Sequence, residues 1–174
     1  MATQPEILRE LFVLGLRNAH AVEKQALSIM TPQVERIVNY PEVADRLQLH
    51  IEETHGQIAR LDEILESLAS SGSVLKDTAL SMSGGMAAIM HSVAGDEILK
   101  NSYANYAFEH FEIAAYKSLL TLADDGGFTQ SITALRQSLG EEESMAAWID
   151  DSLPSITRRY IALRAEEGSG EAKV

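Results

Sequence analysis

Glutamate residues stand at three places where the helical periodicity of the sequence calls for hydrophobic side chains. With side chains about 100° apart around each helix axis, Glu109 and Glu142 fall near the centres of apolar stripes, and Glu23 borders a third stripe beside small alanines. A buried, isolated carboxylate is unfavourable, so it must be protonated, paired or bound to a cation. Basic residues are few and mostly occupy polar faces. The pattern therefore predicts a buried site in which cations neutralise these acids.

Two overlapping residue pairs compete to complete this site from the apolar segment at 41–68. Glu52 and His55 match the Glu-x-x-His pattern of di-iron carboxylate bundles, yet Glu52 points almost directly away from the apolar stripe. His50 faces inward with Glu53 on its flank, which gives the same spacing in reverse order. Periodicity favours His50 and Glu53, and Glu52 with His55 remains the alternative.

The donor atoms of this predicted site indicate the metal that it would bind. Oxygen-rich ligation with one or two imidazoles suits iron or manganese better than zinc. Two divalent cations bridged by carboxylates would satisfy several acids together, and open coordination positions would bind oxygen or peroxide. Tyr116 shares the face of Glu109 and can donate a hydrogen bond or an electron. Each acid taken singly is also explained as a solvated or salt-bridged residue, but inward acids on four segments favour the metal site.

The composition of the chain excludes several classes of protein and of binding site. The 174 residues are 45% hydrophobic, carry a formal net charge of −12 and include no cysteine. The lack of cysteine excludes disulfides, thiolate zinc sites and iron–sulfur clusters. The acidic excess argues against nucleic acid and anionic membranes as partners. Because no basic start precedes an apolar run, we expect a cytoplasmic protein.

Apolar residues at helical spacing predict the elements that position these side chains. Pro32 is expected to kink or restart the first helix, and Pro154 to end the fourth helix or open a shorter fifth one. The expected long helices cover residues 5–30, 41–68, 96–123 and 129–153, and the fifth helix covers 155–164.

The connections predict the topology. Residues 70–81 are rich in Ser and Gly and form the expected crossover, extended by a short helical piece at 86–93. Four long helices with one crossover between the second and third make a ferritin-like four-helix bundle. We therefore expect an all-α domain over residues 1–167 and a flexible tail at 168–174.

Four segments carry a resemblance to a known family. They are LFVLGLRNAHAVEKQAL at 11–27, HIEETHGQIARL at 50–61, YAFEHFEIAAYKSLLTL at 106–122, and residues 135–146. These segments resemble the YciF/YciE-type ferritin-like family of bacterial stress-associated proteins. The resemblance covers about residues 5–165. It implies a four-helix bundle with a fifth helix, a homodimer, distant kinship to rubrerythrin and bacterioferritin, and a di-metal site.

The resemblance also implies a set of ligands. Carried over residue by residue, it assigns Glu23 to the first helix, Glu53 with His50 beside it to the second, Glu109 and Glu112 to the third, and Glu142 to the fourth. Met145 stands where the bacterioferritin-like motif has histidine, so one side of the site has fewer ligands. The segment SGGMAAIMHS at 83–92 also lacks an acidic residue expected from relatives.

Three functions follow as hypotheses. The leading one is a cytoplasmic homodimer with two iron or manganese ions that reduces peroxide or oxygen, or oxidises Fe(II), under stress. The second is a non-catalytic structural or interaction protein of the stress response whose metal site is degenerate or empty. An iron-storage cage is the weakest, because a chain of this length would need a large assembly.

Overall fold

The structure is a computed structural model that describes residues 2–70, 95–167 and 174. Four long helices make up this part of the chain, with one 3-10 turn and no strand: α1 (Gln4–Arg36), α2 (Pro41–Ser70), α3 (Glu97–Asp125), η2 (Thr129–Ser131) and α4 (Ile132–Glu167). The predicted all-α fold is confirmed. The expected crossover from residue 71 onward, the helical piece at 86–93 and tail residues 168–173 lie outside the described residues.

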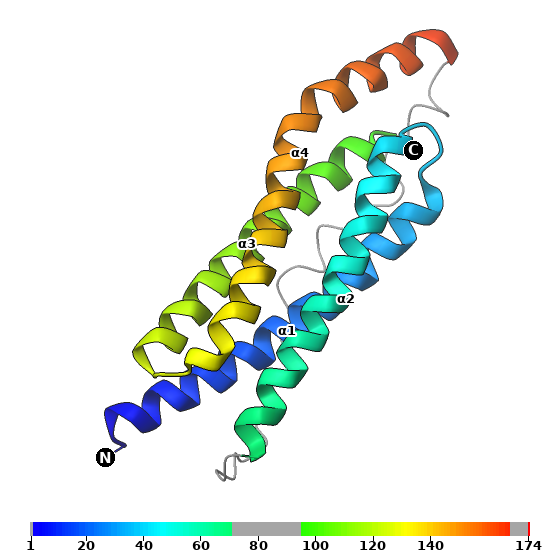
Figure 1. Ribbon diagram of the computed structural model, residues 1–174. Helices are drawn as coiled ribbons and strands as arrows, with labels where there is room; N and C mark the ends of the chain where they lie inside the picture. Colours follow the sequence, from blue (N-terminus) through cyan, green and yellow to red (C-terminus); the bar gives the residue numbers. More distant parts are fainter. Residues whose placement is uncertain (1, 71–94, 168–173) are drawn as a thin grey trace.

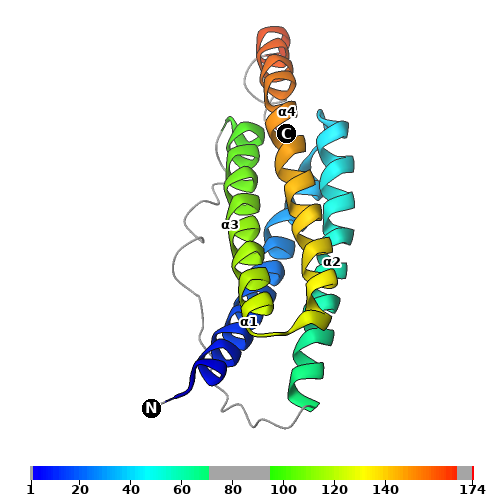
Figure 2. The ribbon, with the colours of Figure 1, turned by 60° about the vertical axis from the view of Figure 1, so that its left-hand side comes forward.

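The four helices are arranged as a bundle with a long axis (Figures 1 and 2). α1 packs against α2 and α3, and α4 packs against α3 and α2. α2 ends at the end of the bundle opposite to the start of α3, so these two helices run parallel, while α1 and α4 run the other way (Figure 1). Parallel α2 and α3 are the topology expected when a crossover joins the second and third helices.

Local signals define two of the helix ends. The backbone N–H of Thr3 donates to Oε2 of Glu6 at 2.7 Å, and Pro5 occupies the first turn of α1, where its missing N–H costs nothing. Gly127 follows α3 with a φ of 72°, a left-handed conformation that glycine adopts without a steric penalty.

The hydrophobic core is divided into two clusters along the bundle axis. One cluster contains Met30, Leu47 and Ile156, and the other contains Phe12, Leu61 and Leu135. Each helix passes from one cluster to the other, and several buried polar side chains, among them Glu23, His50, Glu109 and Glu142, lie on the turns where the two clusters meet. Of the described helices, none is long and apolar enough to cross a lipid bilayer.

The prediction of a separate fifth helix after Pro154 is wrong, because α4 continues through Pro154 to Glu167. A proline inside a helix removes one hydrogen bond and costs about 3 kcal/mol. Packing overrides this local cost here: Ile156 is 1% exposed in the first core cluster, and Tyr160 and Leu163 pack against the same cluster. α1 likewise continues through Pro32 to Arg36.

Candidate metal centre

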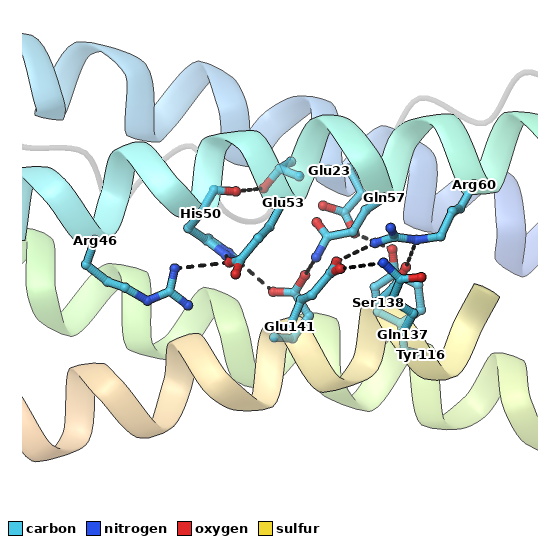
Figure 3. A network of polar contacts seen from close by, with 12 residues as sticks. Glu23, Arg46, His50, Glu53, Gln57, Arg60, Tyr116, Gln137, Ser138 and Glu141 are labelled. Atoms are coloured by element: carbon cyan, nitrogen blue, oxygen red, sulfur yellow. Dashed lines mark hydrogen bonds and ion pairs between the residues drawn. The ribbon is translucent and has the colours of Figure 1, made fainter. Parts of the chain in front are cut away.

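Each of the four helices brings at least one ionisable side chain to the polar layer between the two core clusters (Figure 3). α1 supplies one acid, α2 an imidazole, α3 two acids and α4 one acid, and all are almost fully buried: Glu23 1%, His50 1%, Glu109 2%, Glu112 2% and Glu142 0% exposed. Within the described residues, four acids therefore share the layer with a single histidine.

Three of these residues form a compact group around one ring nitrogen of His50. Nε2 of His50 lies 3.1 Å from Oε2 of Glu109 and 3.4 Å from Oε2 of Glu142. One donor atom from each of the three side chains lies within 4.8 Å of the others, so the group has the composition and the spacing to hold a metal ion. The three residues come from α2, α3 and α4, so this group depends on the packing of the bundle.

The remaining acids lie beside this group and lack full hydrogen bonding. The phenol of Tyr116, itself 0% exposed, donates a hydrogen bond of 2.5 Å to Oε1 of Glu23. Oε2 of Glu23 and both carboxylate oxygens of Glu112 are buried with no hydrogen-bond partner among the described residues. Buried oxygens without partners are rare in folded proteins and call for an explanation, such as an ion.

Burial and mutual repulsion oppose ionisation of these carboxyl groups. Burial, followed by the charge of Glu142, raises the pKa of Glu23 to about 8. Burial also raises the pKa of Glu142 to about 8. The pKa of Glu112 lies well above its ordinary value, first because of burial and then because of the charges of Glu23 and Glu142. Without a cation, the layer must therefore hold protons that carboxyl groups normally release at neutral pH.

His50 responds in the opposite sense to the same acids. Burial alone lowers the pKa of His50, but hydrogen bonds to Glu109, Glu142 and Glu53 outweigh burial and raise this pKa to about 12. The imidazolium thus supplies positive charge to the acidic layer. A metal ion binds only the neutral imidazole, so binding would release this proton and place the ion's own charge among the acids.

The residues present fit a divalent cation. They offer carboxylate oxygens and one imidazole nitrogen, a donor set suited to iron or manganese. The oxygens of Glu112 and Oε2 of Glu23 are available as additional donors beside the compact group. Among the described residues, no second imidazole lies in this layer, and Met145, at the position where the bacterioferritin-like motif has histidine, is 1% exposed in the first core cluster.

The structure separates the two candidate pairs on α2. His50 is buried, while Glu52 and His55 are exposed. Glu53, expected as a ligand, does not join the compact group. Its Oε2 lies 2.8 Å from Nδ1 of His50, the ring nitrogen that does not face Glu109 and Glu142, and its side chain is 22% exposed.

The buried face of α3 is rotated relative to the expected one. Helical spacing predicts an inner face around Glu109 made of Leu99, Ser102, Tyr106, Ile113 and Leu120. Glu109, Ser102 and Ile113 are buried as expected, but Leu99, Tyr106 and Leu120 are only partly buried. The buried face also contains Glu112, which spacing placed on the flank, and the full set is Glu97, Ile98, Ser102, Asn105, Phe108, Glu109, Glu112, Ile113, Tyr116, Leu119 and Ala123. This rotation moves Glu112 from the flank into the polar layer.

Polar contacts that helical spacing does not predict lie beside the polar layer (Figure 3). Arg60 donates through Nε to Oγ of Ser138 at 3.0 Å and pairs with Glu141, so it joins α2 to α4. Gln57, 0% exposed, donates to Oε1 of Glu142. One sequence signal for the arginine is Gly56: a Cβ there would lie 3.3 Å from Nη1 of Arg60.

Comparison with known proteins assigns the chain to a family. Residues 7–162 match the family described as Domain of unknown function (DUF892). The chain belongs to the DUF892 family. This match confirms the resemblance to YciF-type proteins, because Protein YciF of Escherichia coli strain K12 is 28% identical over 144 residues, which are 79% of this chain and 84% of YciF.

Two solved structures of similar proteins share the fold. A Xanthomonas campestris pv. campestris protein is 32% identical, with a TM-score of 0.74 over 91% of this chain and 98% of its own. The E. coli stress protein YciF is 26% identical, with a TM-score of 0.72 over 89% of this chain and 97% of its own. The DUF892 chain described here thus has relatives of matching length and architecture, one of which is a stress protein.

Proposed function

We propose that this protein is a metal-dependent oxidoreductase of the stress response, in which two iron or manganese ions are held by Glu23, His50, Glu109, Glu112 and Glu142. The observation that carries the proposal is the buried group of His50, Glu109 and Glu142, with unpartnered carboxylate oxygens of Glu112 beside it. Ionised carboxylates of this kind are unfavourable in the folded protein unless they are paired or bound to a cation.

Two bound ions would supply two electrons to peroxide or oxygen, or would be the site at which Fe(II) is oxidised. The chain's own residues position and protect this chemistry. Carboxylates from α1, α3 and α4 and the imidazole from α2 hold the ions, and the two hydrophobic clusters on either side limit water. The Tyr116 phenol, hydrogen-bonded to Glu23, fixes that carboxylate and can supply a proton or an electron.

The proposal extends to the setting of the protein. By the resemblance, we propose a cytoplasmic homodimer whose substrate is a small oxidant able to enter a helical bundle. Neither nucleic acid nor a membrane is a proposed partner, which is consistent with the net charge of −12.

A second function is favoured by one observation. Met145 occupies the place of a histidine ligand and is buried in the hydrophobic core. A site with fewer ligands is consistent with a non-catalytic structural or interaction protein, whose buried acids and His50 form only a hydrogen-bonded network.

A peroxide-consumption assay distinguishes the oxidoreductase from the structural protein. Protein stripped with a chelator, reloaded with Fe(II) or Mn(II) and mixed with hydrogen peroxide and a reductant should consume peroxide, and the Glu109→Ala variant should not. Equal rates in loaded protein, stripped protein and the variant would contradict the oxidoreductase and favour the structural protein.

A further inference from the structure

Glu53 stands between the solvent and His50. Its side chain is 22% exposed, whereas that of His50 is 1% exposed. Oε2 of Glu53 lies 2.8 Å from Nδ1 of His50, and the same oxygen lies 3.0 Å from Nη1 of Arg46 (Figure 3). All three residues belong to α2, so one helix carries an uninterrupted Arg46–Glu53–His50 chain of polar contacts.

The two ring nitrogens of His50 have different neighbours. Nδ1 faces Glu53, while Nε2 faces Glu109 and Glu142. A neutral imidazole carries one N–H, and the carboxylate behind the ring determines which nitrogen keeps it. With Glu53 accepting the Nδ1 proton, the proton released on metal binding would come from Nε2, and the lone pair left on Nε2 would point to the acids of α3 and α4. Glu53 follows His50 by three residues, so the two side chains are neighbours on the surface of α2. Oγ1 of Thr54 also donates a 2.8 Å hydrogen bond to the backbone carbonyl of His50.

Arg46 holds the Glu53 carboxylate in place beside His50. Its side chain is 10% exposed, and its guanidinium donates to the oxygen that faces His50. The positive charge of Arg46 also offsets the negative charge that the Glu53 carboxylate brings beside the acidic layer.

We infer that Glu53 is a positioning residue rather than a metal ligand: it accepts the Nδ1 proton of His50 and presents Nε2 to a divalent cation held by Glu109 and Glu142, while Arg46 holds Glu53 in place. This inference rests on the proposed metal function. Metal-bound histidines commonly donate the second ring N–H to a carboxylate, and loss of that partner lowers metal affinity about 10–100-fold.

The test is a titration of stripped, full-length protein with Co(II), followed by its visible absorption. Glu53→Gln should bind with the wild-type stoichiometry and about 10–100-fold weaker affinity. Glu52→Gln, one position away on the exposed face of α2, is the matched control and should bind as wild type does. Arg46→Gln should weaken binding in the same direction, which gives a second readout if Glu53→Gln folds poorly.

A measurement on the imidazole separates positioning from a general structural effect. In Zn(II)-loaded wild-type protein, ¹⁵N NMR should show a proton on Nδ1 of His50 and none on Nε2. Wild-type affinity in both Glu53→Gln and Arg46→Gln, or a proton on Nε2, would overturn the positioning role while the metal site itself stands. A lower stoichiometry in Glu53→Gln, as in Glu109→Ala, would also overturn it by making Glu53 a ligand. Absence of metal binding by the wild type would instead refute the proposed function.

Discussion

Of the two acids that face Nε2 of His50, Glu109 is the closer, because its Oε2 lies 3.1 Å from Nε2 while that of Glu142 lies 3.4 Å away. We expect Glu109→Ala to abolish tight metal binding, since it removes the central carboxylate of the compact group. Titration calorimetry with Mn(II) on stripped protein measures this. Glu52→Ala should bind as wild type does because Glu52 is exposed. Unchanged binding by Glu109→Ala would reject the assigned site.

Glu112 carries two buried oxygens that lack hydrogen-bond partners among the described residues. Replacing it with leucine removes a polar group of this kind, whose burial costs about 1–3 kcal/mol. We expect Glu112→Leu to stabilise the metal-free protein by about this amount and to weaken metal binding. Urea denaturation of stripped protein checks the first effect. A loss of stability of similar size would show that Glu112 has a favourable partner in the metal-free state.

At the residue scale, helical spacing alone identifies the inward positions but not the partners. It correctly places His50 inside and Glu52 outside, because the apolar residues on α2 form a clear stripe. It cannot show that Glu53 contacts Nδ1 rather than the compact group, since that depends on which way the imidazole ring faces. The contact of Arg60 with Ser138 and Glu141 joins two helices and has no local pattern beyond Gly56.

At the scale of the elements, α4 extends through Pro154 because its second half packs onto the bundle. Ile156 is 1% exposed, and Leu or Ile to Ala changes in a core cost about 2–5 kcal/mol. We expect Ile156→Ala to lower the free energy of unfolding by this amount, measured in urea. Ile161→Ala, at a side chain that is 61% exposed, is the control and should have little effect. Equal effects of the two changes would contradict the packing of this half of α4.

The boundaries of the helices could be predicted except where a proline lies within one. Proline disfavours the helix locally, so the sequence predicts a kink or restart at Pro32 and a helix end at Pro154. Only the long-range contacts of Gln33 and Ile156 reveal that both helices continue. The rotation of α3 was harder to predict, because acids and amides occupy its buried face. Asn105 exchanges two hydrogen bonds with Gln33 of α1, at 3.2 and 3.0 Å, and such pairs cannot be read from one helix.

At the scale of the whole molecule, the polar layer couples stability to pH. The pKa of Glu23 and that of Glu142 are raised to about 8, and the pKa of His50 is raised to about 12. In the unfolded chain these groups titrate at about 4.3 for Glu and about 6.5 for His. The folded state therefore holds more protons across neutral pH, so stability falls as pH rises.

We expect the melting temperature of stripped protein to be lower at pH 9 than at pH 6. The lowered pKa of Glu53 acts in the opposite sense, but only below its ordinary value and outside this window. Excess Mn(II) should remove the decrease, because a bound cation takes the place of the protons and binds more tightly at higher pH. A melting temperature of stripped protein that rises from pH 6 to pH 9 would contradict the protonated acidic layer.

The arrangement of the bundle makes the site a property of all four helices together. α1, α3 and α4 each bring acids, and α2 brings the imidazole, to one level between the two core clusters. The most direct test of the central claim is a high-resolution crystal structure of wild-type protein purified without chelator, with metal content measured on the same sample. The account predicts stoichiometric iron or manganese, with anomalous density between Nε2 of His50 and the carboxylates of Glu109 and Glu142. Metal-free protein in which these three side chains contact only one another would contradict it.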